Sequence, residues 1–231
     1  MQIIEFLGLP GSGKTTITKE LIEELKLLGL HTHDYDKIRD LKVFSDFKIR
    51  TVPKLFKFVI FFVRNLYTYQ NLVKQSKNAS VIISQRHKRS LVYLKTLFIL
   101  DQLDNDSIVI LEEGLLQNIW SLYLNSSLVD LTGVLELVHS NLDKYDKYTF
   151  VFLETDISIA ASRIQGRKKT FRQTRFNRMK DDVLKNTLKA NENLMYRIKE
   201  LFKVQYSFRS DLPPKENSKI IIAKLRTEEK L

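Results

Sequence analysis

The strongest constraint in this chain is an eight-residue run near its N-terminus that fits the pattern G-x-x-x-x-G-K-[ST], namely Gly8-Leu9-Pro10-Gly11-Ser12-Gly13-Lys14-Thr15. This is the Walker A pattern of phosphate-binding loops, in which glycines let successive backbone N–H groups point inward around anionic oxygens. The chain holds only seven glycines among its 231 residues, and three of them lie in this run. The pattern is therefore not a by-product of a glycine-rich composition.

The segments on either side of the loop are those that a phosphate site needs. The apolar run Ile3 to Leu7 predicts a buried strand before the loop, and apolar residues at helical spacing predict a helix over residues 14–28 that ends at Gly29. The N-terminus of that helix adds the positive end of its dipole. Lys14 is expected to reach the β- and γ-phosphates, and Thr15 to offer a hydroxyl ligand to Mg²⁺. We predict that ATP and Mg²⁺ bind through Gly8, Pro10, Gly11, Ser12, Gly13, Lys14, Thr15 and Thr16.

Apolar runs alternate with helical patterns along the rest of the chain. Strands are expected at residues 3–7, 31–35, 108–111, 149–153 and 220–223, and helices at 14–28, 114–124, 157–164 and 181–204. Strands that are apolar throughout and separated by helices indicate an α/β fold, with a parallel sheet covered by helices on both faces. Residues 37–105 are predicted to be mostly helical with a break at Pro53, and we interpret them as a substrate-binding insertion within a single domain spanning residues 1–231.

Carboxylates follow two of the predicted strands, at the edge where open α/β sheets bind ligands. Glu112 is predicted to hold the metal, whereas Glu113 is either a functional acid or a charge partner of a helix N-terminus. Asp34 ends the second strand, where it would face an acceptor and take a hydroxyl proton. Because aspartate also caps helices, a structural role before Lys37 is an equal alternative.

A basic stretch begins at the end of the helix predicted over residues 157–164. Its first part reads Arg163-Ile164-Gln165-Gly166-Arg167, and it continues with Lys168, Lys169, Arg172, Arg175 and Arg178. Arginines of this kind can neutralise the charge that spreads over a transferring phosphoryl group, while a solvated basic loop is the alternative. Arg86 and Arg89 could bind an acceptor phosphate, but a solvated helix face is the favoured interpretation for them.

The loop, the strand-end carboxylate and the R-I-Q-G-R run together resemble the P-loop small-molecule kinases of the nucleoside monophosphate kinase and nucleoside kinase group. The arginine pair Arg163 and Arg167 is similar to the pair that enters the lid of adenylate kinases, and residues 108–114 are similar to the apolar run and acid of thymidylate and deoxynucleoside kinases. The resemblance implies a three-layer P-loop NTPase fold with a five-stranded sheet in the order 2-3-1-4-5. It also implies ATP as donor, with Arg163 and Arg167 on its phosphates and a basic lid at about residues 165–179. The D-R-Y or E-R-S of these kinases is replaced here by Glu112-Glu113-Gly114.

The amino-acid composition excludes some classes of site and leaves several classes of binding partner open. Without cysteine the chain has no disulfide, thiolate metal site or cysteine nucleophile, and its net charge of +11 suits phosphates, nucleic acid or an anionic membrane surface. No signal peptide is recognised at the N-terminus, which favours the cytoplasm. The apolar run Leu55–Val63 is too short to span a bilayer. It is predicted to be a buried helix, with a membrane-surface helix flanked by Lys54, Lys57 and Arg64 as the alternative.

The sequence as a whole predicts a small phosphotransferase that moves the γ-phosphate of ATP to a nucleoside, nucleotide or related small molecule. Lys14, Glu112, Arg163 and Arg167 would act on the phosphates and the metal, and Asp34 or Glu113 would orient or deprotonate the acceptor. Three alternatives stay open: a kinase of a nucleic-acid end, a kinase of a sugar or cell-envelope precursor, and a non-catalytic nucleotide-binding module. The acceptor, the choice between ATP and GTP, and the oligomeric state are left undecided.

Overall fold

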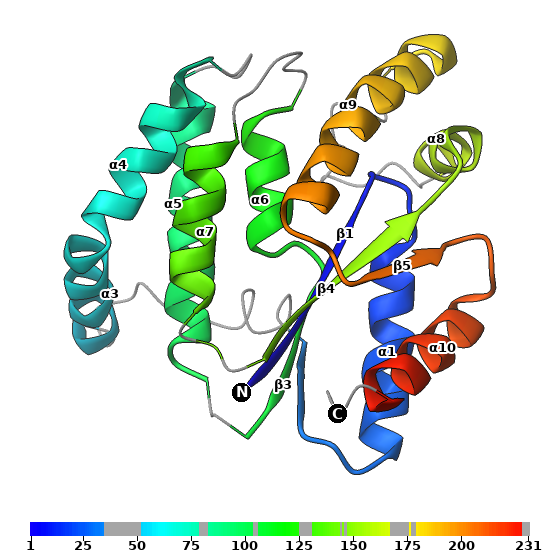
Figure 1. Ribbon diagram of the computed structural model, residues 1–231, viewed down its shortest axis with the longest axis horizontal. Helices are drawn as coiled ribbons and strands as arrows, with labels where there is room; N and C mark the ends of the chain where they lie inside the picture. Colours follow the sequence, from blue (N-terminus) through cyan, green and yellow to red (C-terminus); the bar gives the residue numbers. More distant parts are fainter. Residues whose placement is uncertain are drawn as a thin grey trace.

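Five parallel strands form the sheet at the centre of the computed structural model of this protein, which describes residues 1–34, 52–78, 83–103, 106–124, 131–143, 145, 147–166, 176 and 179–227 (Figure 1). The strands are β1 (Gln2–Gly8), β2 (Thr32–Asp34), β3 (Ile108–Leu111), β4 (Lys147–Glu154) and β5 (Tyr206–Arg209). Their order is β2-β3-β1-β4-β5. This confirms the predicted topology and places the strand before the phosphate-binding loop at the centre of the sheet.

The helices cover both faces of this sheet. Those of the first half are α1 (Lys14–Leu27), α3 (Val52–Arg64), α4 (Leu66–Gln75) and α5 (Ile83–Leu100), with the short 3₁₀ helix η2 (Ser76–Asn78) between the last two. Those of the second half are α6 (Leu115–Leu122), α7 (Thr132–Leu142), α8 (Ile157–Gln165), α9 (Asp181–Leu201) and α10 (Pro214–Thr227). Figure 1 shows α1 and α10 on one side of the sheet and α4 to α7 on the other.

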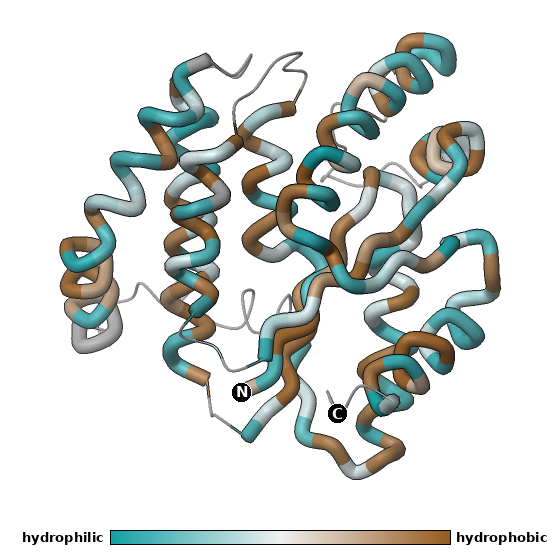
Figure 2. The backbone as a smooth tube through the Cα atoms, in the orientation of Figure 1, coloured by the Kyte–Doolittle hydropathy of each residue, from teal (hydrophilic) through white to brown (hydrophobic). Residues whose placement is uncertain are grey.

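Alternate side chains of β1 point to opposite faces of the sheet and pack into the hydrophobic cores between the sheet and the helices. Ile4 and Phe6 point to the face where α1 and α10 pack, whereas Leu7 joins the cluster formed with α5, α6, α7 and α9. Every residue of β1 is buried, as expected for a central strand of a parallel sheet that helices cover on both faces. The colours of Figure 2 show this hydrophobic centre.

Most of the expected helices and strands are present, and the prediction of one strand is wrong. The helix over 14–28 is α1, and Gly29 behind it has the positive φ of 76° that a glycine at this place supplies. The expected strand over residues 220–223 is instead part of α10, and the fifth strand is β5. The reason is that Ile221, Ile222 and Leu225 lie on one buried helical face, so the short apolar run belongs to a helix.

The segment interpreted as an insertion is helical where the structure describes it. Residues 52–78 and 83–100 form α3, α4, η2 and α5, and Pro53 sits in the first turn of α3, where its missing N–H costs nothing. Residues 35–51 lie outside the described residues. Helix α3 is not the buried helix that was expected, because Phe56 and Val63 are each 64% exposed. None of the helices in the described ranges is long and apolar enough to cross a membrane.

Candidate active site

The loop between β1 and α1 has the backbone of a phosphate-binding nest. Gly11 and Gly13 both have a φ of 85°, a conformation that only glycine adopts without strain. At Gly11 a side chain would also collide with α8, because an added Cβ would lie 2.4 Å from the carbonyl oxygen of Ala160. The turn therefore requires glycine at both positions, and the close approach of α8 requires it at Gly11 as well.

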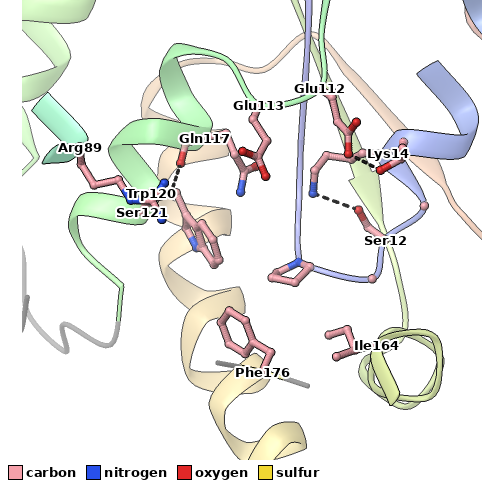
Figure 3. A pocket seen from close by; sticks show the side chains of 14 residues that line it. Ser12, Lys14, Arg89, Glu112, Glu113, Gln117, Trp120, Ser121, Ile164 and Phe176 are labelled. Carbon is pink, nitrogen blue, oxygen red and sulfur yellow. Dashed lines mark hydrogen bonds between the residues drawn. The ribbon is translucent and has the colours of Figure 1, made fainter. Parts of the chain in front are cut away.

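Lys14 lies folded across the loop, at the first residue of α1. Its ammonium donates hydrogen bonds to the carbonyl oxygens of Gly8 at 2.6 Å and Leu9 at 3.0 Å. It also donates to the hydroxyl of Ser12 at 3.4 Å, as Figure 3 shows. The residue is buried. A lysine held in this way places a positive charge inside the curve of the loop, where an anion would sit.

Thr15 and Glu112 meet beside the loop although they are 97 residues apart. The Thr15 hydroxyl donates a hydrogen bond to Oε1 of Glu112, which follows the last residue of β3 (Figure 3). The hydroxyl and the carboxylate are hard oxygen donors of the kind that Mg²⁺ prefers. In the described ranges, no group of three or more His, Cys, Asp or Glu side chains is arranged to hold a metal ion.

A cavity of about 340 Å³ opens on the α6 side of the loop. The loop and Glu112 form one wall, and the other is formed by Glu113, Gln117 and Trp120 (Figure 3). The remaining side chains that line it come from α5, α6, α8 and the segment before α9, and they are Arg89, Ser121, Ile164 and Phe176. Two aromatic rings and several groups that can form hydrogen bonds thus face the same cavity as the loop.

A second cavity of about 310 Å³ lies on the other side of the loop and shares Gly11 and Gly13 with the first. Arg163 of α8 borders it and connects α8 to the phosphate-binding loop and to the segment after β5. Its guanidinium donates to the carbonyl oxygen of Gly11 at 3.4 Å and to the carbonyl oxygen of Ser210 at 3.0 Å. The other residues that line this cavity are Thr16, Ile17, Leu212 and Pro214.

Glu5 is a fully buried carboxyl group in the middle of β1, and the sequence patterns did not single it out. It accepts hydrogen bonds from the backbone N–H groups of Leu115 at 2.9 Å and Gln117 at 3.1 Å, and from the hydroxyl of Tyr148 at 2.6 Å. It thus caps α6, whose own N-cap residue Gly114 supplies no side chain. A Cβ on Gly114 would lie 2.4 Å from Cδ of Glu5, so this position has room only for glycine.

Burial raises the pKa of Glu5 from 4.5 to about 7, and the donors from Tyr148, Gln117 and Leu115 oppose this shift. Burial and the neighbouring Glu5 in turn hold the pKa of Tyr148 well above its ordinary value, so the phenol stays protonated and donates to the carboxyl group. The start of α6, which carries Gln117 and Trp120 into the first cavity, is therefore fixed from the centre of the sheet.

The structure brings together many, but not all, of the residues that the sequence indicated. The loop, Glu112, Glu113 and Arg89 border the first cavity, while Arg163 and Thr16 border the second. Asp34 ends β2 as expected, but it is not among the described residues that line either cavity. Outside the described residues lie Arg167, Lys168, Lys169, Arg172, Arg175 and Arg178, and with them most of the expected lid.

The sequence patterns indicated Glu113 but not Gln117, Trp120 and Ser121, which α6 contributes to the first cavity. These three residues occupy positions i, i+3 and i+4 of the helix, which is the spacing of one helical face. That spacing was available as a signal once Glu112 and Glu113 had been identified.

Comparison with known proteins supports the fold. The sequence matches no protein-family model and no curated protein sequence. Among solved structures, the chain is similar to deoxyadenosine kinase from M. mycoides with bound dCTP, at 17% identity and a TM-score of 0.52 over 98% of this chain and 100% of that one. The same enzyme with dCMP and dCDP bound gives 18% identity and a TM-score of 0.51 over the same shares of the two chains. The shikimate kinase from Bacteroides thetaiotaomicron follows at 13% identity and a TM-score of 0.48, over 100% of this chain and 99% of that one. The chain thus has the fold of the P-loop kinases that its motifs resemble.

Proposed function

We propose that this protein is a phosphotransferase that uses ATP and Mg²⁺ to phosphorylate a small molecule. The observation that carries the proposal is the position of the loop, which lies between two cavities and shares Gly11 and Gly13 with both. A donor nucleotide on one side and an acceptor on the other would meet at Lys14. Phosphoryl transfer needs this in-line arrangement of the two substrates and little covalent chemistry from the protein.

The donor belongs in the second cavity. Its volume of about 310 Å³ and its partly apolar lining, with Ile17, Leu212 and Pro214, suit a purine base beside the nest that binds the triphosphate. Thr15 and Glu112 would hold Mg²⁺ against the β- and γ-phosphates, and the ion would neutralise the charge that develops on them. Arg163, bound to the loop and to Ser210, would keep the edge of this cavity in place.

The acceptor belongs in the first cavity. Glu113 borders it and Asp34 does not, so Glu113 is the better candidate to accept the proton of an attacking hydroxyl. The rings of Trp120 and Phe176 and the amide of Gln117 favour an acceptor with both a flat apolar part and polar groups. The molecules bound to the M. mycoides kinase are deoxynucleotides, and nucleosides therefore come first among the candidates for the acceptor.

The test is a panel of deoxynucleosides, nucleoside monophosphates, sugars and oligonucleotides, each incubated with Mg²⁺ and γ-labelled ATP and scored for a labelled product. We expect transfer to a small acceptor, and its loss in Lys14→Ala but not in Lys26→Ala, which removes an exposed lysine from the far end of the same helix. Transfer to oligonucleotide ends would favour a nucleic-acid kinase. ATP binding without transfer to any acceptor would favour a nucleotide-binding module.

A further inference from the structure

Helices α3, α4 and α5 come from a part of the chain with an extreme charge balance. Residues 51–100 contain no Asp or Glu and hold nine Lys and Arg, which are Lys54, Lys57, Arg64, Lys74, Lys77, Arg86, Lys88, Arg89 and Lys95. The whole protein has a net charge of +11, so this helical unit carries +9 of it in about a fifth of the length. Such a concentration of one sign creates a field that attracts an extended anionic partner.

The outer face of α3 is apolar and lies open to solvent. Phe56, Val59, Ile60 and Val63 follow the helical intervals of three and four residues, and their exposed fractions are 64%, 47%, 37% and 64%. Tyr67 continues the stripe onto α4, with 73% of its surface exposed. Figure 2 shows the hydrophobic colouring of α3 at the outer edge of the molecule, away from the sheet. Apolar side chains gathered in this way mark a contact surface.

The opposite face of α3 fixes the helix to the protein. The ring of Phe98 in α5 lies 5.2 Å from that of Phe58 and 5.3 Å from that of Phe61, measured between ring centroids. Phe62 contacts Tyr69 of α4 at 5.4 Å. The exposed stripe is therefore presented by a helix that is already folded and anchored, and binding through it needs no ordering of this helix.

Basic side chains lie at the border of the stripe. Lys57 and Arg64 are exposed, and they line a hollow of about 410 Å³ together with Ile60 and Phe61. Asp101, the acidic group in the same hollow, accepts a hydrogen bond from Tyr145 at 3.1 Å. Cations beside an aromatic and aliphatic face are the pattern of helices that lie in the interface of a lipid bilayer.

We propose that the outer face of α3 binds the surface of an anionic lipid bilayer, with the stripe in the interface and the exposed basic residues at its border, Lys57 and Arg64, near the phosphates. A helix of 13 residues cannot span a bilayer, but its apolar face can enter the interface. A second copy of this chain is a poor partner for the same face, because two units of +9 would meet. A nucleic acid would contact the basic residues through its phosphates but would not bury the aromatic and aliphatic stripe.

The test is flotation of the full chain with vesicles of phosphatidylcholine alone and with vesicles that contain 30% phosphatidylglycerol. We expect binding to the anionic vesicles at low salt, weaker binding at 0.5 M salt and little binding to the neutral ones. Phe56→Ser/Val63→Ser should reduce partitioning roughly 100-fold, on the basis of about tenfold for each side chain. The control Leu27→Ser/Val183→Ser removes two side chains that are 81% and 51% exposed on other helices, and it should bind as the parent does.

The charge is tested separately by Lys57→Gln/Arg64→Gln, which should weaken binding about 25-fold at low salt, since each charge near the surface contributes about fivefold. Lys19→Gln/Lys26→Gln is its control, because it removes the same charge at the same seven-residue spacing from α1. Equal losses in the two charge pairs, equal binding to neutral vesicles, or no binding to any vesicle would overturn the proposal. So would a stable dimer in sedimentation velocity that Phe56→Ser/Val63→Ser converts to a monomer. ATP affinity is also measured in each variant. An unchanged ATP affinity shows that a loss of vesicle binding does not come from damage to the nucleotide site, so the membrane proposal and the kinase proposal are tested independently.

Discussion

The Glu5→Gln variant tests how strongly the stability of the protein depends on pH through one buried carboxyl group. Glu5 has no exposed surface and a pKa of about 7, raised by burial from 4.5. Because the folded protein holds this proton more tightly than the unfolded chain does, the contribution of the group to stability is complete below pH 4.5. It is lost as the pH rises through 7.

The size of this loss follows from the change in pKa. A rise from 4.5 to about 7 corresponds to about 3 kcal/mol of unfolding free energy, which Glu5 contributes at acidic pH and loses above pH 7. Glutamine has no proton to lose in this range. The difference in unfolding free energy between the parent and Glu5→Gln should therefore shift by about 3 kcal/mol against the parent between pH 4.5 and 8.

The assay is urea unfolding at several pH values between 4.5 and 8, followed by the fluorescence of Trp120. This is the single tryptophan of the chain, it is buried in α6, and its indole donates to the carbonyl oxygen of Asn191. Tyr148→Phe serves as a matched variant because it keeps the carboxyl group and removes one donor, so it should move the step to higher pH. A difference between parent and Glu5→Gln that stays constant across this range, or that grows in favour of the parent, would refute the reasoning.

Three further substitutions test neighbouring contacts. Gly114→Ala should cost about 1–3 kcal/mol of stability, because its Cβ would lie 2.4 Å from Cδ of Glu5; urea unfolding of the double variant with Glu5→Ala should show that the two effects are not additive. Glu112→Gln should remove most of the gain in ATP affinity that Mg²⁺ provides, so that ATP titrations with Mg²⁺ and with EDTA give similar affinities. An unchanged gain would show that Glu112 does not bind the metal. Arg163→Ala should weaken ATP binding roughly tenfold through its lost contacts with the loop and Ser210, with little change in thermal stability; a fall in Tm with unchanged ATP affinity would leave Arg163 a purely structural role.

Local patterns were enough to predict the sheet, but not all of its strands. The runs that become β1 and β3 are short, apolar and bounded by the loop or by carboxylates, so length and context identified them. The run Ile220 to Ala223 looks the same in isolation, yet it lies inside α10. Tyr206–Arg209, the true fifth strand, alternates buried and exposed residues, and this period-two signal was present but weaker than the apolar run.

The candidate site divides in the same way. The loop and Glu112 were found because their chemistry depends on residue types at fixed short spacings. The contact between Glu5 and the start of α6 joins residues 110 positions apart, and neither a lone glutamate in an apolar strand nor Gly114 carries a local sign of it. The second cavity depends likewise on Ser210 and Leu212, which reach the loop only through the order of the strands.

Calorimetric titration of the purified chain with Mg²⁺·ATP tests most directly whether the loop at Gly8 to Thr15 holds a nucleoside triphosphate. We expect saturable binding at one site per chain. In Lys14→Ala the affinity should fall roughly 100-fold or more, because a charge-assisted contact with the phosphates is lost in a partly closed site. Lys26→Ala should bind as the parent does. The absence of heat from the parent with both ATP and GTP, or equal affinity in the parent and Lys14→Ala, would contradict the account.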